Sequence, residues 1–264
     1  FLQALASSKA VNLLSTLTTL SLAQGLQRTI PAAPTREAAH GALRYNRHAA
    51  GATRRIIRIG LSEIAFAAAD MPLCLAKDGQ TGRFNLVALM SLIEPANLFV
   101  FAGGFQATYV PRAALLGGFR LAADGAGGLA IDPADPTLGQ EGEALFEGDR
   151  PAPIVADIAR ALGQVVADVT AVQSLVDAWA AHHLIRPLAV SLNKADGSDH
   201  DLAGLYTIDE VAMQGLPDAE LLALHRADRL APAAVLTASL AQVERLRQLH
   251  NARFTPAITA CSLD

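Results

Sequence analysis

The spacing of apolar residues changes along the chain and separates two kinds of segment. From Ile56 to about Val110, short apolar runs are typical of β-strands. Later, eight apolar residues from Val155 to Trp179 are spaced alternately by three and four, which predicts one helix over residues 153–183 with a buried stripe. Burial against a sheet or another helix is the first interpretation of this stripe. A two-stranded coiled coil between protomers, which would make a homo-oligomer, is the second.

Two Asp-Gly pairs mark hairpins in this pattern. Asp78-Gly79 separates "MPLCLAKD" from "FNLVALMSLI", and Asp196-Gly197 divides the run from Leu188 to Ile208 into two strands. Pro217 and Pro232 then begin two C-terminal helices. The sequence therefore predicts an α+β fold, with antiparallel β hairpins in the N-terminal half, a long amphipathic helix, a further hairpin and C-terminal helices.

A third hairpin is predicted over residues 97–111, "NLFVFAGGFQATYVP". Leu98 to Phe101 forms one strand, Gly103-Gly104 turns the chain, and Phe105 to Val110 returns. The glycines match no phosphate-binding pattern, and no helix start follows them. We therefore interpret them as a turn. The rings of this segment are the largest apolar groups available to anchor the core, and they are Phe99, Phe101, Phe105 and Tyr109.

Composition narrows the class of protein. Hydrophobic residues make up 52% of the 264 residues and charged residues 17%, which is typical of a folded chain. A net charge of −4 gives no electrostatic footprint for nucleic acid, and the arginines from Arg44 to Arg58 are interpreted as a solvated face. Two cysteines build no disulfide framework, so the cytoplasm is favoured over the cell surface while the compartment stays undetermined.

The first thirty residues carry no charge between Lys9 and Arg28, but they are too polar for a transmembrane span. We expect an amphipathic helix that packs on the rest of the chain or on a protein partner through residues 1–30. The predicted organisation is a helical extension and linker over 1–42, an α+β domain over 43–253, and a tail without clear pattern over 254–264.

The search for chemistry gives weak candidates. His182-His183 and the Asp199–His200–Asp201 run lack converging metal-ligand geometry, and the loop acids Asp132, Asp135, Glu141, Glu143 and Glu147 lack a calcium-loop pattern. No nucleophile motif is present, so no catalytic residue, metal or cofactor is predicted and an enzyme is the weaker interpretation. The candidates for binding a ligand, with the arginines as anion-holding groups, are Arg83, Phe105, Tyr109, Arg112 and Arg120.

Segments quoted in order along the chain carry a family resemblance. They are Glu63-Ile64-Ala65, "MPLCLAKD", Phe84 to Leu92, Asn97 to Val100, Phe105 with Tyr109-Val110-Pro111, Gly142 to Phe146, Leu184 to Leu188, Asp196-Gly197, Gly204 to Glu210, Leu216 to Asp218 and Ser239 to Leu246. Together they resemble the SapC family of bacterial proteins. Ile64 stands where Phe is usual, "LLGGF" replaces an Arg-Arg-Tyr-Pro-Phe run, and the first forty residues have no counterpart.

The resemblance implies a surface-layer (S-layer)-related protein and assigns no catalytic residue. The first functional hypothesis is a non-enzymatic binding or assembly protein that acts through protein partners. The alternative is an accessory protein or enzyme that handles an amino-acid-like or peptide ligand, in association with halogenase-like and TonB-dependent receptor systems.

Overall fold

The structure is a computed structural model that describes residues 33–34, 43–102, 104–121, 129–148 and 150–264. The chain divides into two compact units. Unit 1 comprises residues up to Arg54, Val100–Gln106 and Arg112–Ala167, and unit 2 comprises Arg55–Phe99, Ala107–Pro111 and Asp168–Asp264. Helices occur together with antiparallel sheets, which confirms the α+β prediction. Apart from residues 33–34, the predicted N-terminal extension lies outside the described residues.

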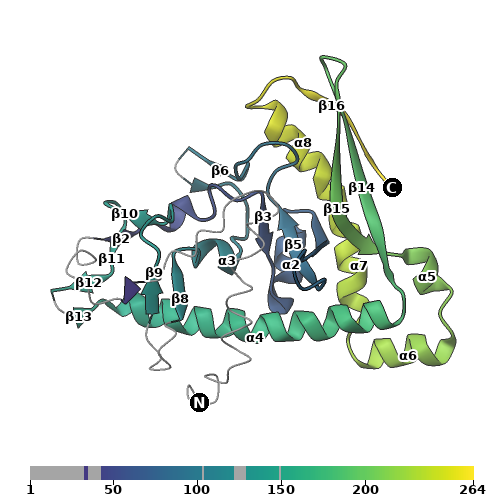
Figure 1. The fold of residues 1–264 in the computed structure, drawn as a ribbon, viewed down its shortest axis with the longest axis horizontal. Helices are drawn as coiled ribbons and strands as arrows, with labels where there is room; N and C mark the ends of the chain where they lie inside the picture. The colour runs from purple at the N-terminus through teal and green to yellow at the C-terminus, as the bar shows by residue number, and fades with distance from the viewer. Residues whose placement is uncertain (1–32, 35–42, 103, 122–128, 149) are drawn as a thin grey trace. The chain divides into compact units, whose positions relative to one another are not determined.

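A six-stranded antiparallel sheet forms the centre of unit 2, in the order β16-β14-β15-β4-β5-β3 (Figure 1). Its strands are β3 (Ile56–Arg58), β4 (Leu73–Lys77), β5 (Phe84–Leu89), β14 (Ile185–Lys194), β15 (Asp199–Ile208) and β16 (Ile258–Leu263). Both Asp-Gly hairpins are confirmed, as β4–β5 and β14–β15. Gly82 and Gly197 take φ values of 69° and 83° at these turns, which glycine adopts without strain.

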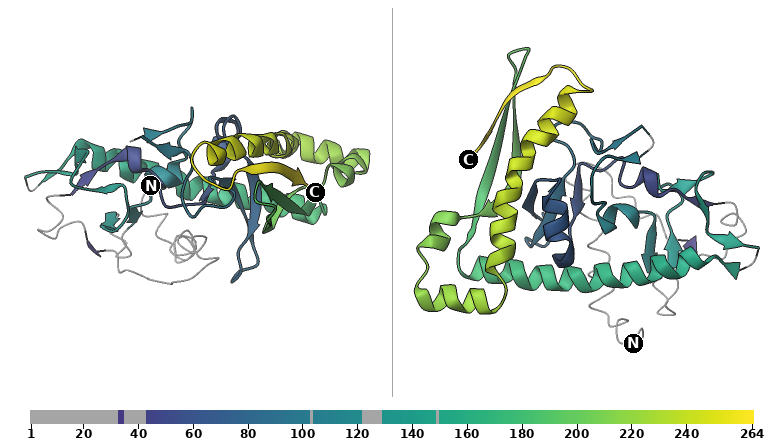
Figure 2. Two further views of the ribbon diagram at one scale, coloured as in Figure 1. Left: turned by 90° about the horizontal axis from the view of Figure 1, so that it is seen from above. Right: turned by 180° about the vertical axis from the view of Figure 1, so that it is seen from behind.

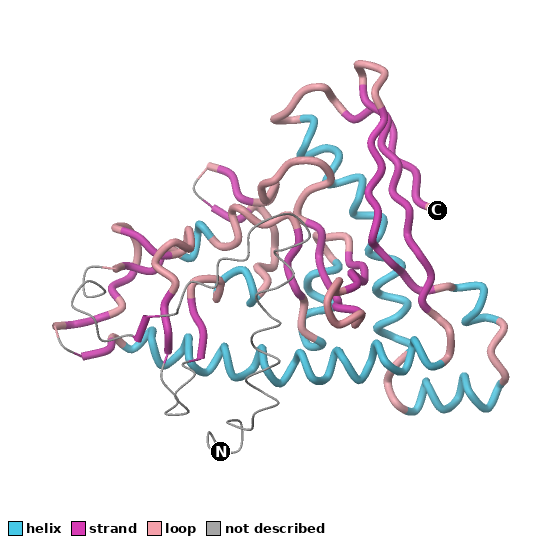
Figure 3. The backbone as a smooth tube through the Cα atoms, in the orientation of Figure 1, coloured by secondary structure: helices cyan, strands magenta, loops and turns pink. Residues whose placement is uncertain are grey.

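Strand β16 lies in the segment that we predicted to be a tail without clear pattern. It pairs with β14 at the sheet edge, and Figure 3 shows it in magenta beside the two long strands of the hairpin. Most of its residues after Ile258 are exposed. An edge strand with little burial needs no apolar alternation, so the periodicity on which the prediction relied is absent.

The helices of unit 2 pack near this sheet, with α7 against β4 and β15 and α8 against β16 (Figure 2). They are α2 (Ile64–Ala68), α5 (Glu210–Gln214), α6 (Asp218–Arg226), α7 (Leu230–Ser239) and α8 (Val243–Asn251), with short 3₁₀ turns at Leu61–Glu63 and Leu240–Gln242. We predicted one helix from Pro232 onward. This prediction is wrong, because a 3₁₀ turn separates α7 from α8. The Asp209 side chain caps α5 by accepting the Ala212 N–H bond at 2.9 Å.

The long helix α4 (Pro153–Ala181) is continuous, as the apolar spacing predicted. Residues up to Ala167 belong to unit 1 and the rest to unit 2. Its stripe is buried at Ile158 and Leu162 in the first unit and at Val176 and Trp179 in the second, which supports burial within the chain. Of the helices in the described residues, none is long and apolar enough to cross a membrane.

Unit 1 is built from short strands that pack beside the first part of α4. Its elements are β1 (Ala33–Pro34), β2 (Arg44–Tyr45), a 3₁₀ turn (Arg47–Ala49), β6 (Val100–Phe101), β7 (Gly104–Phe105), α3 (Arg112–Leu115), β8 (Phe119–Leu121), β9 (Leu129–Ile131), β10 (Leu138–Gly139), β11 (Glu143–Ala144), β12 (Phe146–Glu147) and β13 (Arg150–Pro151). The core includes Tyr45 and Phe119, whose rings meet edge to face at 5.5 Å, together with Ile158 and Leu162.

The hairpin predicted over residues 97–111 is much shorter than expected. Only the two-residue strands β6 and β7 pair, and Gly103 lies outside the described residues. Ala102, and not Gly104, takes a left-handed φ of 50°. Phe99 is fully buried, whereas Phe101 is 55% exposed. The prediction that these rings anchor the core is therefore confirmed for Phe99 and wrong for Phe101, which lies beside the turn.

Candidate functional site

Residues from separate motifs of the sequence meet in unit 2 around two buried carboxylates. The first belongs to Glu63, which lies just before α2 and is 1% exposed. Tyr109 Oη donates a hydrogen bond to Glu63 Oε1 at 2.8 Å, and the Gly60 N–H group donates to Oε2 at 2.8 Å. Through these two hydrogen bonds, Glu63 anchors Tyr109 to the turn that precedes α2.

The second carboxylate is that of Asp70, which follows α2 and is 3% exposed. Its Oδ2 atom accepts the backbone N–H groups of Thr108 at 2.6 Å and Tyr109 at 3.3 Å. Its Oδ1 atom accepts Arg245 Nη1, on α8, at 2.6 Å. Asp70 therefore holds three chain segments together: the end of α2, the loop Ala107–Pro111 and helix α8.

An exposed aromatic pair lies next to these anchors. The rings of Phe66, on α2, and Tyr109 stack with centroids 5.6 Å apart and planes inclined by 26°. Phe66 is 62% exposed, and Tyr109 is half-buried. Because Tyr109 is fixed by Glu63 through its hydroxyl and by Asp70 through its backbone, the pair has a rigid base.

Other motif residues have supporting roles in the same unit. Phe99 is fully buried, and the Arg245 guanidinium lies 5.6 Å from its ring centroid, within the range of a cation–π contact. Ser239 Oγ accepts the Leu73 N–H bond at 2.8 Å and donates to the Leu236 carbonyl at 2.6 Å, so it ties β4 to α7.

This arrangement is suited to presenting a surface. A general acid or base must reach the proton that it transfers. Here both carboxylates are buried and accept bonds from the protein's own N–H, O–H and guanidinium groups. Their role in this geometry is to fix the Tyr109 loop, while Phe66 remains open to solvent.

The five predicted ligand-binding residues are divided between the two units. Arg83 and Tyr109 lie in unit 2, whereas Phe105, Arg112 and Arg120 lie in unit 1. Arg83 is exposed in the β4–β5 turn, and Tyr109 belongs to the carboxylate cluster. Phe105 is half-buried in β7, and Arg112 begins α3. Their role in binding a ligand stays a prediction.

Arg120 is held by its own neighbourhood in unit 1. Its Nη1 atom donates to the carbonyl oxygens of Gly117 at 3.1 Å and Phe119 at 3.2 Å. Burial lowers the pKa of this guanidinium, and the nearby Arg54 lowers it further. Arg120 thus satisfies backbone carbonyls at the start of β8.

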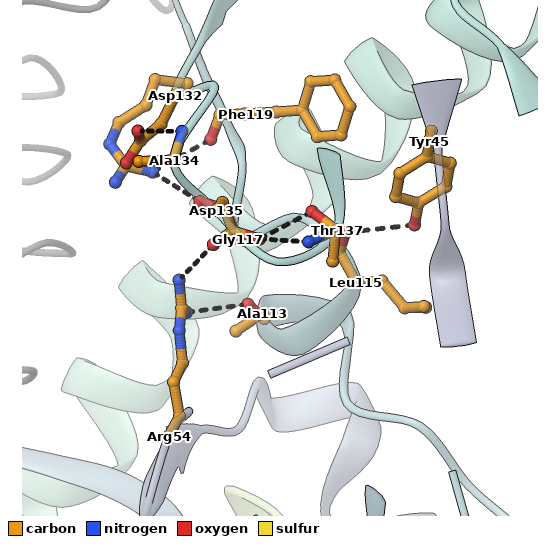
Figure 4. Close-up of polar contacts among 11 residues, drawn as sticks. Tyr45, Arg54, Ala113, Leu115, Gly117, Phe119, Asp132, Ala134, Asp135 and Thr137 are labelled. Atoms are coloured by element: carbon orange, nitrogen blue, oxygen red, sulfur yellow. Dashed lines mark hydrogen bonds and ion pairs between the residues drawn. The ribbon is translucent and has the colours of Figure 1, made fainter. Parts of the chain in front are cut away.

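Asp135, one of the acids of the long connection in unit 1, has a similar structural role. In Figure 4, the Arg54 side chain reaches the Ala113 carbonyl at 3.2 Å and Asp135 Oδ2 at 3.3 Å. Asp135 Oδ1 accepts the N–H and hydroxyl groups of Thr137 at 3.0 and 2.7 Å. Tyr45 Oη donates to the Leu115 carbonyl at 3.0 Å, and burial raises the pKa of Tyr45 to about 12. Within the described residues, no group of three His, Cys, Asp or Glu side chains gathers to hold a metal ion.

Unit 1 also contains a cavity of about 390 Å³. Its lining residues all have apolar side chains, and they are Phe119, Leu129, Ile131, Leu145, Phe146, Pro151, Ala152, Pro153, Val155, Ala156 and Ala159. An amino-acid-like ligand carries an ammonium and a carboxylate group, and burying either without a partner is costly. The side chains that line this cavity offer neither group a charged or polar partner.

Sequence reasoning named Tyr109 as a candidate but missed the side chains that hold it in place. Glu63 and Arg245 lie within the family motifs Glu63-Ile64-Ala65 and Ser239 to Leu246. Their place in these motifs was the one sequence feature that could have marked them as site residues. Asp70 lies between motifs and carried no signal of its own. The contacts around Asp70 span 38 and 175 residues along the chain, so local patterns cannot reveal them.

The fold and this cluster define an α+β protein whose motif residues converge to hold an exposed aromatic pair. A family model for SapC matches residues 36–246, which is most of the chain, so the chain belongs to the SapC family. Comparisons with curated proteins and with solved structures each gave no match.

Proposed function

We propose that this SapC family member is a non-enzymatic binding or assembly protein that acts through protein partners. The observation that carries the proposal is the Phe66–Tyr109 pair. Glu63 and Asp70 hold Tyr109 in place, and the Phe66 ring that stacks on Tyr109 is 62% exposed.

A rigid, exposed aromatic group is a common anchor in protein–protein interfaces. Aromatic residues and arginine dominate the binding free energy at such interfaces. A side chain that is already ordered loses less conformational entropy on binding, which favours the complex. Tyr109 is ordered by Glu63 and Asp70, and it orders Phe66 in turn by stacking. A surface-layer-related role, as the resemblance implies, is the setting that we propose for this binding.

The proposal is tested by placing a photoreactive benzoyl-phenylalanine at Phe66 of the full chain in its native cells. We expect a covalent adduct with one protein partner, and we expect Phe66→Ser to abolish co-purification of that partner. Phe101 is a matched control, since it is another exposed phenylalanine but lies in unit 1. The same photoreactive group at Phe101 should not give the adduct.

Mass spectrometry of gently purified protein can show whether a small molecule is bound, which is the outcome that would contradict the proposal. A small molecule present at one equivalent, with binding that is unaffected by Phe66→Ser, would contradict the proposal. That result would instead favour the alternative of an accessory protein or enzyme that handles an amino-acid-like or peptide ligand.

A further inference from the structure

Helix α6 (Asp218–Arg226) lies at the outer end of unit 2 and is exposed along most of its surface (Figures 1 and 2). Of its nine residues, all of which the structure describes, only Leu224 is buried. Leu222, by contrast, is 45% exposed. Short helices gain most of their stability from a packed apolar face and are marginal without one. A second helix packed on Leu222 would supply such a face.

The inner side of α6 is fixed to the rest of unit 2. Leu224 is buried, and Glu220 Oε2 lies 2.8 Å from Nδ1 of His182, which follows the end of α4. Successive residues of a helix are about 100° apart, so Glu220 and Leu224 both lie about 160° from Leu222 around the axis. Leu222 therefore points away from the side that unit 2 holds.

The outward face of α6 carries opposite charges on either side of Leu222. Asp218, Leu222 and Arg226 are spaced by four residues, so they form one row along the helix, and all three are exposed. Ala219 and Ala223 lie next to this row and are small enough to let another helix approach closely. A complementary surface must therefore offer a base near Asp218, an apolar group in the middle and an acid near Arg226.

The same row, turned end for end, offers these groups in this order. We propose that α6 packs on α6 of a second copy of the chain, as antiparallel helices related by a two-fold axis beside Leu222. Asp218 of each copy then lies near Arg226 of the other, and the two Leu222 side chains meet. A two-fold axis makes the interface self-complementary, as in most homodimers.

The geometry of helices favours this arrangement. Rows of residues four apart interdigitate in the commonest class of helix packing, with the two axes inclined by about 50°. The antiparallel direction also brings the positive end of each helix dipole near the negative end of the other. Both effects act in addition to the two pairs of opposite charges and the apolar contact between them.

The contact is small, so the dimer is expected to be weak. A helix of nine residues is about 13 Å long, and two such helices bury less than the roughly 1,600 Å² of a standard interface. The inference is independent of the proposed function, because it concerns purified protein alone and a surface that does not include Phe66.

Sedimentation velocity of the full chain from about 1 μM to about 1 mM tests the dimer, and we expect concentration-dependent association. Asp218→Arg gives a row with two bases, and Arg226→Asp gives a row with two acids. Each variant alone should dimerise about tenfold more weakly, because like charges then lie together. An equimolar mixture of the two variants places a base near an acid at both ends, so it should recover the association of the wild-type chain.

The mixture separates charge pairing from any effect of a substitution on α6 itself, since that effect is the same alone and in the mixture. Asp201→Arg is the matched control for net charge. It makes the same change of charge as Asp218→Arg at an exposed position of β15, and it should leave the association unchanged.

Hydrogen exchange gives a second readout on the wild-type chain. The amides of α6 should exchange more slowly at high concentration, because a helix packed on both sides opens less readily. A chain that stays monomeric throughout the range overturns the proposal. A mixture that associates no better than its separate components also overturns it, as does equal weakening by Asp201→Arg, because the association would then use another surface.

Discussion

Replacing Asp70 by alanine tests whether the buried carboxylate fixes the Tyr109 loop. The substitution removes the acceptor of the Thr108 and Tyr109 N–H groups. A buried group left unpaired costs about 1–3 kcal/mol, and the low end of this range applies here because Thr108 is exposed and Tyr109 is half-buried. It also removes the ion pair between Asp70 and Arg245. That side chain is 37% exposed, so water can solvate much of its charge and the full cost of a buried unpaired ion does not apply. The expected loss of unfolding free energy is about 3–5 kcal/mol.

Urea denaturation followed by tryptophan fluorescence measures this loss. Trp179 is the only tryptophan of the chain and is fully buried in unit 2, so its emission reports unfolding of the unit that contains Asp70. Asp177→Ala is the matched control in the same unit. Asp177 is exposed and accepts a bond from the Gln173 amide, so we expect a change within about 0.5 kcal/mol. A loss below about 1 kcal/mol for Asp70→Ala would refute the anchoring role.

Two further predictions concern sites where the backbone or burial leaves little freedom. Gly142 has φ 110°, and a Cβ atom there would lie 2.1 Å from the Tyr45 carbonyl oxygen. Gly142→Ala should therefore destabilise unit 1 by about 2 kcal/mol or more, which faster hydrogen exchange in β2 would show. Gly148→Ala is the control: Gly148 has φ 62°, but no atom would contact the added Cβ, so the substitution should cost about 1 kcal/mol. Burial raises the pKa of the Cys74 thiol to about 12. A thiol reagent at mildly alkaline pH should therefore modify only Cys261 in the folded chain. Rapid reaction of both thiols would contradict the burial of Cys74.

The sequence predicted those elements whose signals are local. The Asp-Gly turns located β4–β5 and β14–β15, and the three-and-four spacing located α4 from end to end. The predictions failed where the surroundings decide the outcome. Phe101 is as apolar as Phe99, yet it lies beside the short β6–β7 turn and stays exposed. Strand β16 has no apolar period because it lies at an edge, so only its pairing with β14 identifies it.

The candidate site was even harder to predict from local sequence signals. It depends on a short segment that belongs to unit 2, while its neighbours in the chain belong to unit 1. Residues Ala107–Pro111 belong to unit 2, whereas the segments on either side of them belong to unit 1. The five residues Ala107–Pro111 are too few to form a core of their own, so hydrogen bonds from other side chains must hold them in place. Asp70 binds the backbone of this segment, and Glu63 binds the Tyr109 hydroxyl.

This placement gives the carboxylates a role in the proposed partner binding beyond their contribution to stability. When Asp70 is removed, Tyr109 loses its backbone bond but keeps the bond from its hydroxyl to Glu63. The segment can then move while the six-stranded sheet stays folded, because local opening costs less free energy than global unfolding. The base beneath Phe66 would no longer be rigid. Partner binding in the Asp70→Ala variant is therefore expected to weaken under conditions in which Trp179 still reports a folded unit 2.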